Sequence, residues 1–257
     1  MRRARLLFEG AARSALVTSE DDVYLEDGGR LPVESCTWLP PATGVLYAVG
    51  LNYAEHANEL TFQPPQEPLV FVKAPGALAG HRARCLRPDG VKLMHFEGEL
   101  AVVIGRHARR VPRAEALDYV AGYTICNDYA VRDYLENYYR PNLRVKSRDG
   151  LTPIGPWIVP VAELGDGAGL GLKTLVNGRE CQSGNTRDMI FSVPHLIEYL
   201  SGILTLAPGD MIATGTPAGF VDVQPGDEVV VEIERIGSLA STIVGERDYY
   251  RVAEHGS

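Results

Sequence analysis

The sequence lacks the features that anchor, export or crosslink a chain. No apolar run approaches the roughly 20 residues of a membrane-spanning helix, and no long apolar core of a signal peptide follows the start at residues 1–6. No Cys-x-x-Cys pair occurs, so neither a zinc site nor a disulfide framework is indicated. We therefore expect a cytoplasmic protein without membrane contact and with reduced cysteines. These are Cys36, Cys85, Cys126 and Cys181.

An excess of basic residues is also missing. The 257 residues include 25 lysines and arginines against 33 aspartates and glutamates, which gives a formal net charge of −8. This balance argues against nucleic acid or an anionic membrane as a partner. A small anionic substrate stays possible, because a metal ion and a few arginines can reverse the local field within a site.

The turn signals divide the chain into a small β-rich lobe, residues 1–43, and a larger domain, residues 44–257. The boundary is placed at Pro40 and Pro41. The spacing of apolar residues predicts a helix over 194–204, whereas most of the chain after residue 150 has a β pattern. We predict a mainly β fold with a few short helices.

Two other segments have helical character. One is residues 112–121, which begins with a proline near its start, and the other is residues 129–137, which has helical propensity and ends before Pro141.

Two glutamates open the strand-like stretch at the centre of the sequence. Glu97 and Glu99 flank Gly98 and precede the apolar run 100–105, which favours a strand. Their side chains would then point the same way, roughly 6–7 Å apart at Cα. Asp128, after a second β-rich run, is the candidate third metal ligand. The alternative is a solvated pair of glutamates at a strand entrance.

Three carboxylates without a thiol would form a hard, oxygen-only site. Mg²⁺ is the first choice for such a site, and Mn²⁺ and Ca²⁺ are alternatives.

A histidine and a glutamate are spaced by one helical turn. His56 and Glu59 lie three residues apart in a short predicted helix, so they share a face and can hydrogen-bond. A histidine held by a carboxylate is typical of an oriented general base. The alternative is an ion pair on the surface of the helix.

Positive charge gathers in one segment of this acidic chain, residues 138–149. An arginine guanidinium can form two parallel hydrogen bonds to one carboxylate, so the segment is a candidate carboxylate-binding site. The alternative is a solvated loop. Lys73, at the end of a strand, could face the same pocket. Arg132 follows Asp128 by four residues and is a candidate substrate or supporting contact. The candidate residues of the segment are Arg140, Arg144, Lys146 and Arg148.

A glycine- and threonine-rich loop at residues 213–219 offers amide and hydroxyl donors that could hold a carboxylate. On its own it is weak evidence, because many strand ends have this composition. Its candidate binding residues are Thr214, Gly215 and Thr216.

Taken together, the motifs resemble the fumarylacetoacetate hydrolase superfamily over roughly residues 45–245. The run 128–146 is similar to the isomerase/decarboxylase branch that acts in aromatic catabolism. The motifs, in the superfamily's order, are Gly-Leu-Asn-Tyr with His56 and Glu59, Phe-Val-Lys at 71–73, Glu97-x-Glu99, Asn127-Asp128 with Arg132, Gly209-Asp210 and Thr214-Gly215-Thr216-Pro217.

The resemblance implies a mixed β-roll around a divalent metal, usually in a homodimer. It implies no ligand role for His95. The roles that it does imply are metal ligation by Glu97, Glu99 and Asp128, acid/base chemistry by His56 and Glu59, catalysis by Lys146, and substrate-carboxylate binding by Arg132, Thr214, Gly215 and Thr216.

The expected activity is decarboxylation of an unsaturated 2-oxo tricarboxylate, isomerisation of its dienoate product, or both. Lys73, Arg140 and Arg144 are the candidates for the remote carboxylates. A second hypothesis is hydrolysis of an acylpyruvate, although Leu135 stands where the acylpyruvase branch has a glutamine. A third is a non-catalytic, metal-stabilised partner of a related subunit.

Overall fold

The computed structural model describes residues 1–18, 22–63, 65–135 and 142–253. Its strands form one large sheet, one five-stranded sheet and one two-stranded sheet. The longest helix of the described residues, α4 (Val193–Ile203), has 11 residues. The prediction of a mainly β fold with a few short helices is therefore confirmed. Within these described ranges, no helix is both long and apolar enough to cross a membrane.

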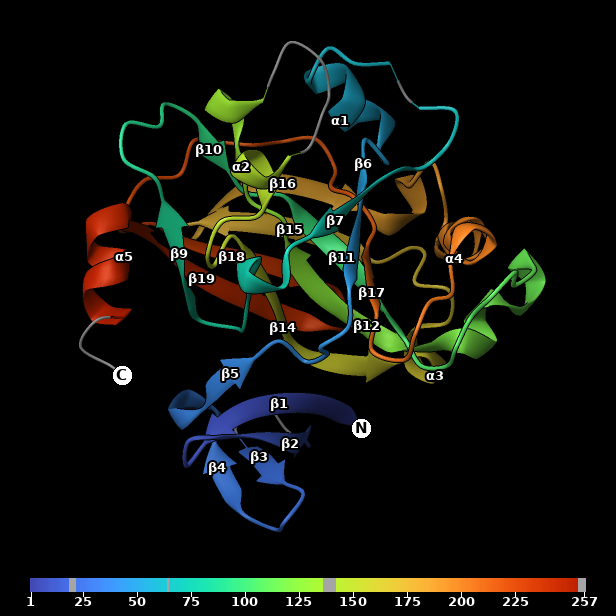
Figure 1. Ribbon diagram of the computed structural model, residues 1–257, viewed down its shortest axis with the longest axis horizontal. Helices are drawn as coiled ribbons and strands as arrows, with labels where there is room; N and C mark the ends of the chain where they lie inside the picture. Colours follow the sequence, from blue (N-terminus) through green and yellow to red (C-terminus); the bar gives the residue numbers. More distant parts are fainter. Residues whose placement is uncertain (19–21, 64, 136–141, 254–257) are drawn as a thin grey trace.

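The N-terminal lobe is an antiparallel sheet that continues into the rest of the molecule (Figure 1). The continuity comes from β1, which pairs with β14 (Thr152–Pro160) through Arg3 opposite Ile158 and Ala4 opposite Trp157. The lobe strands are β1 (Arg2–Phe8), β2 (Ala11–Val17), β3 (Asp22–Leu25), β4 (Arg30–Pro32) and β5 (Thr37–Leu39).

The large sheet runs in the order β4-β3-β2-β1-β14-β12-β11-β17-β6-β7, and β5 and β8 pair beside this path. Strand β11 lies between β12 and β17 and is buried at all seven residues. Burial on both faces accounts for its uninterrupted apolar run. The further strands are β6 (Leu46–Gly50), β7 (Leu69–Lys73), β8 (Leu78–Ala79), β11 (Gly98–Ile104), β12 (Val120–Asn127) and β17 (Met211–Ala213).

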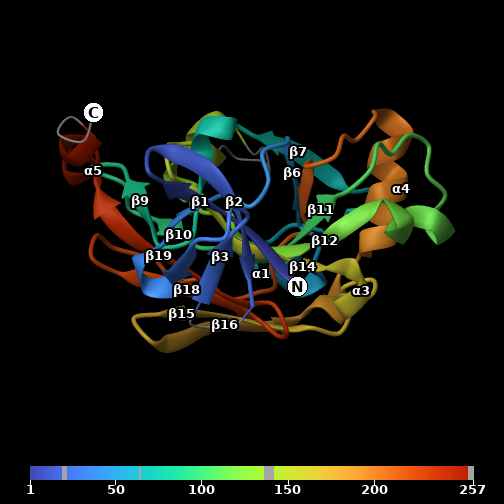
Figure 2. The same ribbon diagram turned by 90° about the horizontal axis from the view of Figure 1, so that it is seen from below.

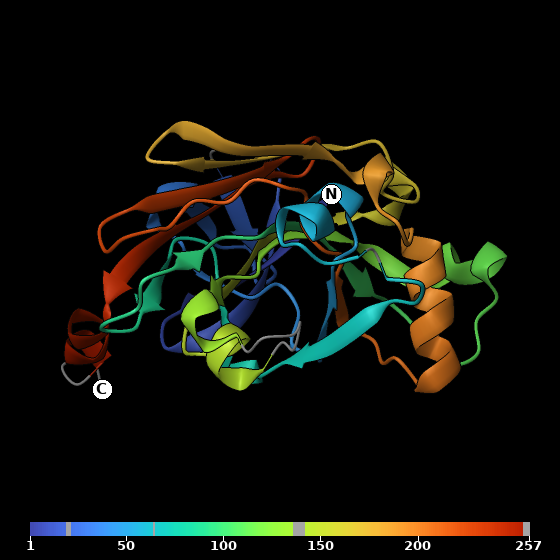
Figure 3. The same cartoon turned by 90° about the horizontal axis from the view of Figure 1, so that it is seen from above.

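The five-stranded sheet forms a second layer over the large sheet (Figures 2 and 3). Leu100 and Tyr123 from the large sheet meet Leu172 and Val231 from the second sheet in one core. Its strand order is β16-β15-β18-β19-β9. The strands are β9 (Ala83–Arg87), β15 (Gly171–Val176), β16 (Arg179–Asn185), β18 (Glu228–Ile233) and β19 (Gly237–Gly245).

Gly98 allows the two layers to approach each other at the start of β11. A Cβ atom there would lie 2.6 Å from Oγ1 of Thr174, 2.9 Å from Val231 and 3.0 Å from Oε1 of Gln182. Real Cβ atoms do not come so close to other heavy atoms, so the close approach requires glycine at this position. The residue between the two glutamates is thus fixed by packing between sheets.

The helix predicted over 194–204 is confirmed as α4, which buries Leu196, Ile197 and Leu200. The segment predicted over 112–121 is a 3-10 helix, η3 (Arg113–Tyr119). The remaining α-helices are α1 (Ala54–Glu59), α2 (Leu143–Lys146), α3 (Val161–Leu164) and α5 (Glu246–Ala253).

The helix predicted over 129–137 is wrong for the described part of that segment. Here β13 (Ala130–Val131) pairs with β10 (Met94–His95), and a single 3-10 turn, η4 (Arg132–Tyr134), follows. The carboxylate of Asp133 accepts hydrogen bonds from the amides of Lys92 and Leu93 at 2.9 and 2.8 Å. These tertiary contacts override the helical propensity of the segment.

Candidate metal centre and active site

Three buried carboxylates meet beside the paired strands β11 and β12. In this antiparallel pair Gly98 lies opposite Asn127, and the amide of Asp128 donates to the carbonyl of Glu97 at 2.9 Å. Glu99 lies two residues beyond Glu97 and so shares its face. One carboxylate oxygen from each of the three lies within 4.8 Å of the others, and each residue is 5% exposed or less. The structure brings together the three predicted ligands.

Two buried lysines lie against two of these carboxylates. Nζ of Lys146 lies 2.6 Å from Oε2 of Glu97 and 3.0 Å from Oδ2 of Asp128. Lys73, at the end of β7, donates to Oδ1 of Asp128 and to the backbone carbonyl of Lys146. Among the described residues no salt bridge reaches Glu99.

The electrostatic surroundings shift the two glutamates in opposite directions. Burial alone would raise the pKa of Glu97, but nearby positive charges, Lys146 first among them, bring that pKa to about 2. Burial and the negative charges of Asp128 and Glu97 raise the pKa of Glu99 well above its usual range. A divalent cation would relieve this repulsion, and carboxylate oxygens are the donors that hard cations prefer. The residues present therefore fit a divalent metal.

The predicted dyad forms on α1. Nδ1 of His56 lies 3.2 Å from Oε2 of Glu59, whose carboxylate also accepts the amide of Gly219 at 3.1 Å. Because a carboxylate only accepts, Nδ1 carries the proton and Nε2 is left with a lone pair. Burial lowers the pKa of His56, opposed by the charges of Glu97 and Glu59. The imidazole is therefore available as a neutral base.

Asn52 connects α1 to the rest of the site. Its side-chain amide donates to the carbonyls of Thr214 and Phe191 at 2.7 and 3.0 Å, and its oxygen accepts the amide of Phe191 at 2.7 Å. The preceding Leu51 has a φ of 58°, a left-handed conformation that turns the chain from β6 into α1. The buried amide thus fixes the helix that carries His56 beside the glycine- and threonine-rich loop.

Arg132 projects from η4 towards the carboxylates. Its Nη2 lies 3.6 Å from Oε1 of Glu97, and its Nε donates to Nε2 of His95 at 2.5 Å. The side chain is 11% exposed. This placement agrees with either of the roles expected for Arg132, a support for the ligands or a contact to substrate.

The loop after β17 touches the centre mainly through its backbone. The amide of Gly215 donates to Oε2 of Glu99 at 2.8 Å, and the hydroxyl of Thr214 donates to the carbonyl of Leu100 at 2.9 Å. The hydroxyl of Thr216 accepts from Nε2 of Gln182 at 2.9 Å and keeps its own proton to donate. Of the three residues expected to donate to a carboxylate, Thr216 is thus the one whose hydroxyl proton is not used in these contacts.

The candidates for remote carboxylates have different surroundings. Lys73 is 1% exposed and points at Asp128, so its ammonium group lies against a predicted metal ligand. Arg144 is exposed, with its guanidinium carbon 4.2 Å from the ring centroid of Tyr134. Arg140 lies outside the described residues.

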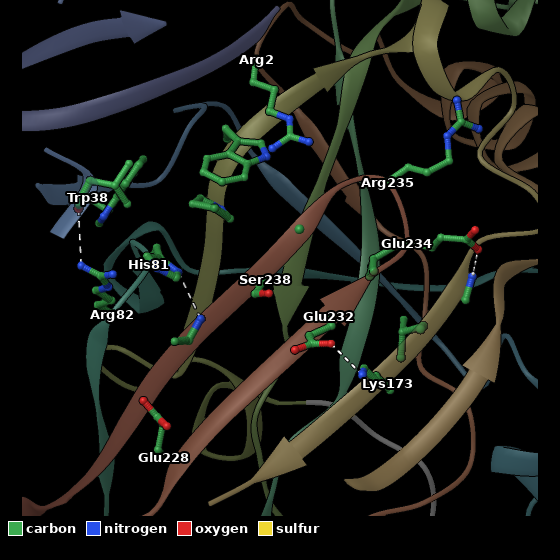
Figure 4. Close-up of a pocket in the computed structure, with 18 of the residues that line it drawn as sticks. Arg2, Trp38, His81, Arg82, Lys173, Glu228, Glu232, Glu234, Arg235 and Ser238 are labelled. Atoms are coloured by element: carbon green, nitrogen blue, oxygen red, sulfur yellow. Dashed lines mark hydrogen bonds and ion pairs between the residues drawn. The ribbon is translucent and has the colours of Figure 1, made fainter. Parts of the chain in front are cut away.

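A cavity of about 890 Å³ lies elsewhere, between the N-terminal lobe and the second sheet (Figure 4). Arg2 and Trp38 line it from the lobe, and Lys173, Glu232 and Ser238 line it from β15, β18 and β19. None of the predicted site residues that the structure describes lines this cavity. It is separate from the carboxylate centre.

The fold and the carboxylate centre have counterparts among known proteins. Residues 45–244, most of the chain, match the family described as fumarylacetoacetate (FAA) hydrolase, C-terminal. The chain belongs to the fumarylacetoacetate hydrolase family. The resemblance expected from the motifs is confirmed, and so is the fold that it implied.

The relatives of this chain include proteins named as an isomerase/decarboxylase, an isomerase and a hydrolase. A 4-hydroxyphenylacetate degradation bifunctional isomerase/decarboxylase of Salmonella dublin is 58% identical over 244 residues, which cover 95% of this chain and 56% of that protein. The structure of a 2-hydroxyhepta-2,4-diene-1,7-dioate isomerase from Mycobacterium marinum has 33% identity and a TM-score of 0.83, covering 96% and 99% of the two chains. The structure of a maleylpyruvate hydrolase from Sphingobium sp. SYK-6 has 28% identity and a TM-score of 0.81, and the match covers 95% of this chain and 100% of that one.

This family member spans about half the length of the curated isomerase/decarboxylases that it matches. It spans nearly the whole length of the two solved structures. A fold of this extent therefore occurs both on its own and as about half of a longer protein.

Sequence reasoning missed several residues that shape this fumarylacetoacetate hydrolase site. Asn52, Gln182 and His95 are each 3% exposed or less and bond to loop or site residues. A signal was present for Asn52, which lies in the Gly-Leu-Asn-Tyr motif, and for His95, which lies on the predicted face of Glu97 and Glu99. The bonds of Gln182 to Thr216 and of His95 to Arg132 join residues 34 and 37 positions apart, which no local pattern indicates.

Proposed function

We propose that this family member is a divalent-metal-dependent enzyme of aromatic catabolism. It would decarboxylate a 2-oxo acid of the 5-oxopent-3-ene-1,2,5-tricarboxylate type, isomerise 2-hydroxyhepta-2,4-diene-1,7-dioate, or do both. The observation that carries the proposal is the buried centre of three carboxylates, with the dyad close enough that His56 and Glu97 shift each other's pKa. The identity of 58% to the Salmonella protein supports the substrate class.

The charge of the centre suits an anionic substrate. Its three carboxylates are balanced by three cations that are 11% exposed or less, Lys73, Lys146 and Arg132. A bound divalent ion would therefore leave two positive charges in a site within a protein of net charge −8. These charges would balance both carboxylates of the dioate and two of the three carboxylates of the tricarboxylate, which favours the binding of either anion over that of neutral ligands.

The metal is proposed to be Mg²⁺, with Mn²⁺ and Ca²⁺ as alternatives, because all three accept oxygen ligands. Glu97, Glu99 and Asp128 would hold it. Bound there, the ion would act as a Lewis acid towards the keto oxygen of the substrate.

The chain's own residues would position the substrate and move its protons. Arg132 and Thr216 would donate to a substrate carboxylate, and Lys146 would add positive charge where negative charge develops as CO₂ leaves. His56, oriented by Glu59, would take a proton from one carbon and return it to another in the isomerisation. The amide of Gly219 keeps the carboxylate of Glu59 in place for this role.

A second candidate is hydrolysis of a C–C bond in an acylpyruvate. The likeness to the maleylpyruvate hydrolase favours it, because the same dyad would activate water in place of moving a carbon-bound proton. Leu135, an apolar side chain, offers no hydrogen bond to such a water. The products separate the two reactions, since release of CO₂ supports decarboxylation and release of pyruvate supports hydrolysis.

Assembly is part of the proposal. The curated isomerase/decarboxylases are about twice as long as this chain, so we propose that two copies, or this chain and a related subunit, associate. The mass of the purified protein in solution tests this, and a monomer with full activity would contradict it.

The decisive experiment is a time course of the purified chain with the tricarboxylate, followed by CO₂ release and ultraviolet absorbance. We expect Mg²⁺-dependent CO₂ release, and a later shift in absorbance if isomerisation follows. A chelator-treated sample is the control. If the chain alone has no turnover while a related subunit restores it, the single-chain activity is refuted and the third hypothesis, a metal-stabilised partner, is supported.

A further inference from the structure

His95 lies behind Arg132 and has no role in the function proposed above. It is the last residue of β10, next to the start of the metal-binding stretch, and is 0% exposed. Its Nε2 lies 2.5 Å from Nε of Arg132, and its Nδ1 lies 2.9 Å from the carbonyl oxygen of Phe96. Both ring nitrogens are thus engaged.

The two partners define one protonation state of the ring. The carbonyl of Phe96 only accepts, so Nδ1 of His95 carries a proton and donates it. Arginine only donates, so Nε2 must present a lone pair to Nε of Arg132. The contacts agree on a neutral imidazole with its proton on Nδ1.

The surroundings prevent the ring of His95 from turning away. Phe220 stacks on it with centroids 4.6 Å apart and an interplanar angle of 29°. The backbone of His95 pairs with Ala130, and the amide of Arg132 donates to the carbonyl of Leu93 at 2.9 Å. Strand pairing and stacking therefore hold His95 and Arg132 side by side.

Only one nitrogen of the guanidinium is held by histidine. Nη2 of Arg132 is buried, makes no hydrogen bond to any residue in the described part of the chain, and lies 3.6 Å from Oε1 of Glu97. A buried donor without an acceptor is costly. A carboxylate brought by the substrate would supply the missing acceptor.

We propose that His95 is a positioning residue, whose neutral ring holds Nε of Arg132 so that the Nη groups face the substrate carboxylate. This inference rests on the proposed function, since it needs Arg132 to bind substrate. It assigns His95 neither a metal ligand nor a proton-transfer role.

Two substitutions separate the contacts of the ring. In His95→Asn the amide nitrogen can take the place of Nδ1 and keep the donor to Phe96, but nothing reaches Arg132. In His95→Gln the longer side chain can place an oxygen near the position of Nε2 and restore the acceptor. The pair thus tests the bond to Arg132, with a buried polar amide present in both.

We expect His95→Asn to raise KM about 10- to 100-fold, the loss typical of a hydrogen bond to a charged group, with kcat changed much less. In His95→Gln the KM should return most of the way to the wild-type value. In an Arg132→Gln background, His95→Asn should have little further effect, because the partner is already gone. Equal KM values for the Asn and Gln variants, or an undiminished effect in the Arg132→Gln background, would overturn the proposal.

A readout that needs no turnover separates this inference from the proposed function. In ¹⁵N NMR, the Nε–H of Arg132 should exchange slowly with water in the wild type and in His95→Gln, and rapidly in His95→Asn. Titration of each variant with Mg²⁺ checks that the carboxylate centre is intact. If His95→Asn weakens Mg²⁺ binding as much as it raises KM, the histidine acts through Glu97 and the proposal fails. If the exchange pattern holds but the wild type has no activity, the proposed function alone is refuted.

Discussion

Glu97 and Glu99 are two residues apart and share a face, yet their surroundings differ. Glu97 lies against Lys146, whereas Glu99 receives an amide hydrogen bond from Gly215 and no salt bridge within the described residues. The energetic need for a cation is therefore concentrated on Glu99. Its charge is unfavourable in the apo protein and becomes favourable when a metal binds.

Glu99→Gln should abolish metal binding and activity together. The loss of Mg²⁺ affinity should exceed the roughly 10- to 100-fold typical of changes around a metal's ligands. The metal-free variant should still fold, because a neutral amide replaces a carboxyl whose charged form is disfavoured by burial and two neighbouring carboxylates. Calorimetric titration with Mg²⁺ and thermal unfolding measure both effects. The exposed Glu115→Gln is the control, and metal-supported turnover in Glu99→Gln would refute the ligand assignment.

His56→Ala should keep its metal and lose turnover. The expected decrease in kcat is roughly 10²- to 10⁴-fold, the contribution typical of general acid/base catalysis. Steady-state kinetics and Mg²⁺ titration on the same sample separate the two properties. Glu55→Ala changes an exposed neighbour on the same helix and should have little effect. An unchanged rate in His56→Ala would return this histidine to a structural role.

At the scale of single elements, β11 carries the proposed ligand Glu99 and also packs between two layers. Its strand character and the common face of Glu99 and the preceding Glu97 follow from alternation and β-branched residues, and both could be predicted. The requirement for Gly98 could not, because it comes from Thr174 and Val231 on the opposite sheet. A local pattern reports what a residue favours, not what is packed against it.

Gly98→Ala should destabilise the protein and weaken the metal site. Its Cβ would overlap Thr174 and Val231, and overpacking of this kind typically costs about 1–3 kcal/mol. Gly202→Ala is a matched control, since nothing lies within 4 Å of its added Cβ near the end of α4. There we expect a stability equal to the wild type or slightly higher. Urea unfolding of both variants decides, and equal stabilities would contradict the packing argument.

The same reasoning applies to the segment after Asp128. Its helical propensity led to the wrong prediction of a helix. The carboxylate of Asp133 accepts the amides of Lys92 and Leu93, and the 3-10 turn η4 forms in place of the helix. By contrast, His56 and Glu59 could be paired from the sequence, since one helical turn sets their spacing. Contacts within a turn were predictable, whereas the bonds of Lys73 to Asp128 and of His95 to Arg132, which join residues far apart in the chain, were not.

For the molecule as a whole, the strands of the N-terminal lobe and the other strands of the large sheet form one hydrogen-bonded sheet. Aromatic rings pack at the junction. The ring centroid of Trp38 in the lobe lies 6.1 Å from that of Trp157 in β14 and 5.6 Å from that of His81. Nδ1 of His81 accepts the amide of Ala240 at 3.1 Å. Burial lowers the pKa of His81 to about 4.

This pKa predicts a pH dependence of stability. Between about pH 4 and 6.5 the unfolded chain binds a proton at His81 that the folded protein does not, so stability rises with pH across this window. The full shift of the pKa changes the free energy of unfolding by about 3 kcal/mol. His81→Asn keeps the acceptor for Ala240 and should flatten the dependence by this amount. Urea unfolding at several pH values tests it, with the exposed His107→Asn as control, and an unchanged slope in His81→Asn would refute it.

The pairing of the sheets also sets an order of folding. Strand β1 pairs with β14, β6 lies parallel to β17, and β9 lies parallel to β19, so early segments wait for partners made some 150 residues later. Loop closure over such distances is slow. On the ribosome, Glu97 and Glu99 are thus synthesised long before Gly215 and the second sheet can enclose them. The contact of Glu99 with Gly215 can therefore form only after the loop that follows β17 has been synthesised.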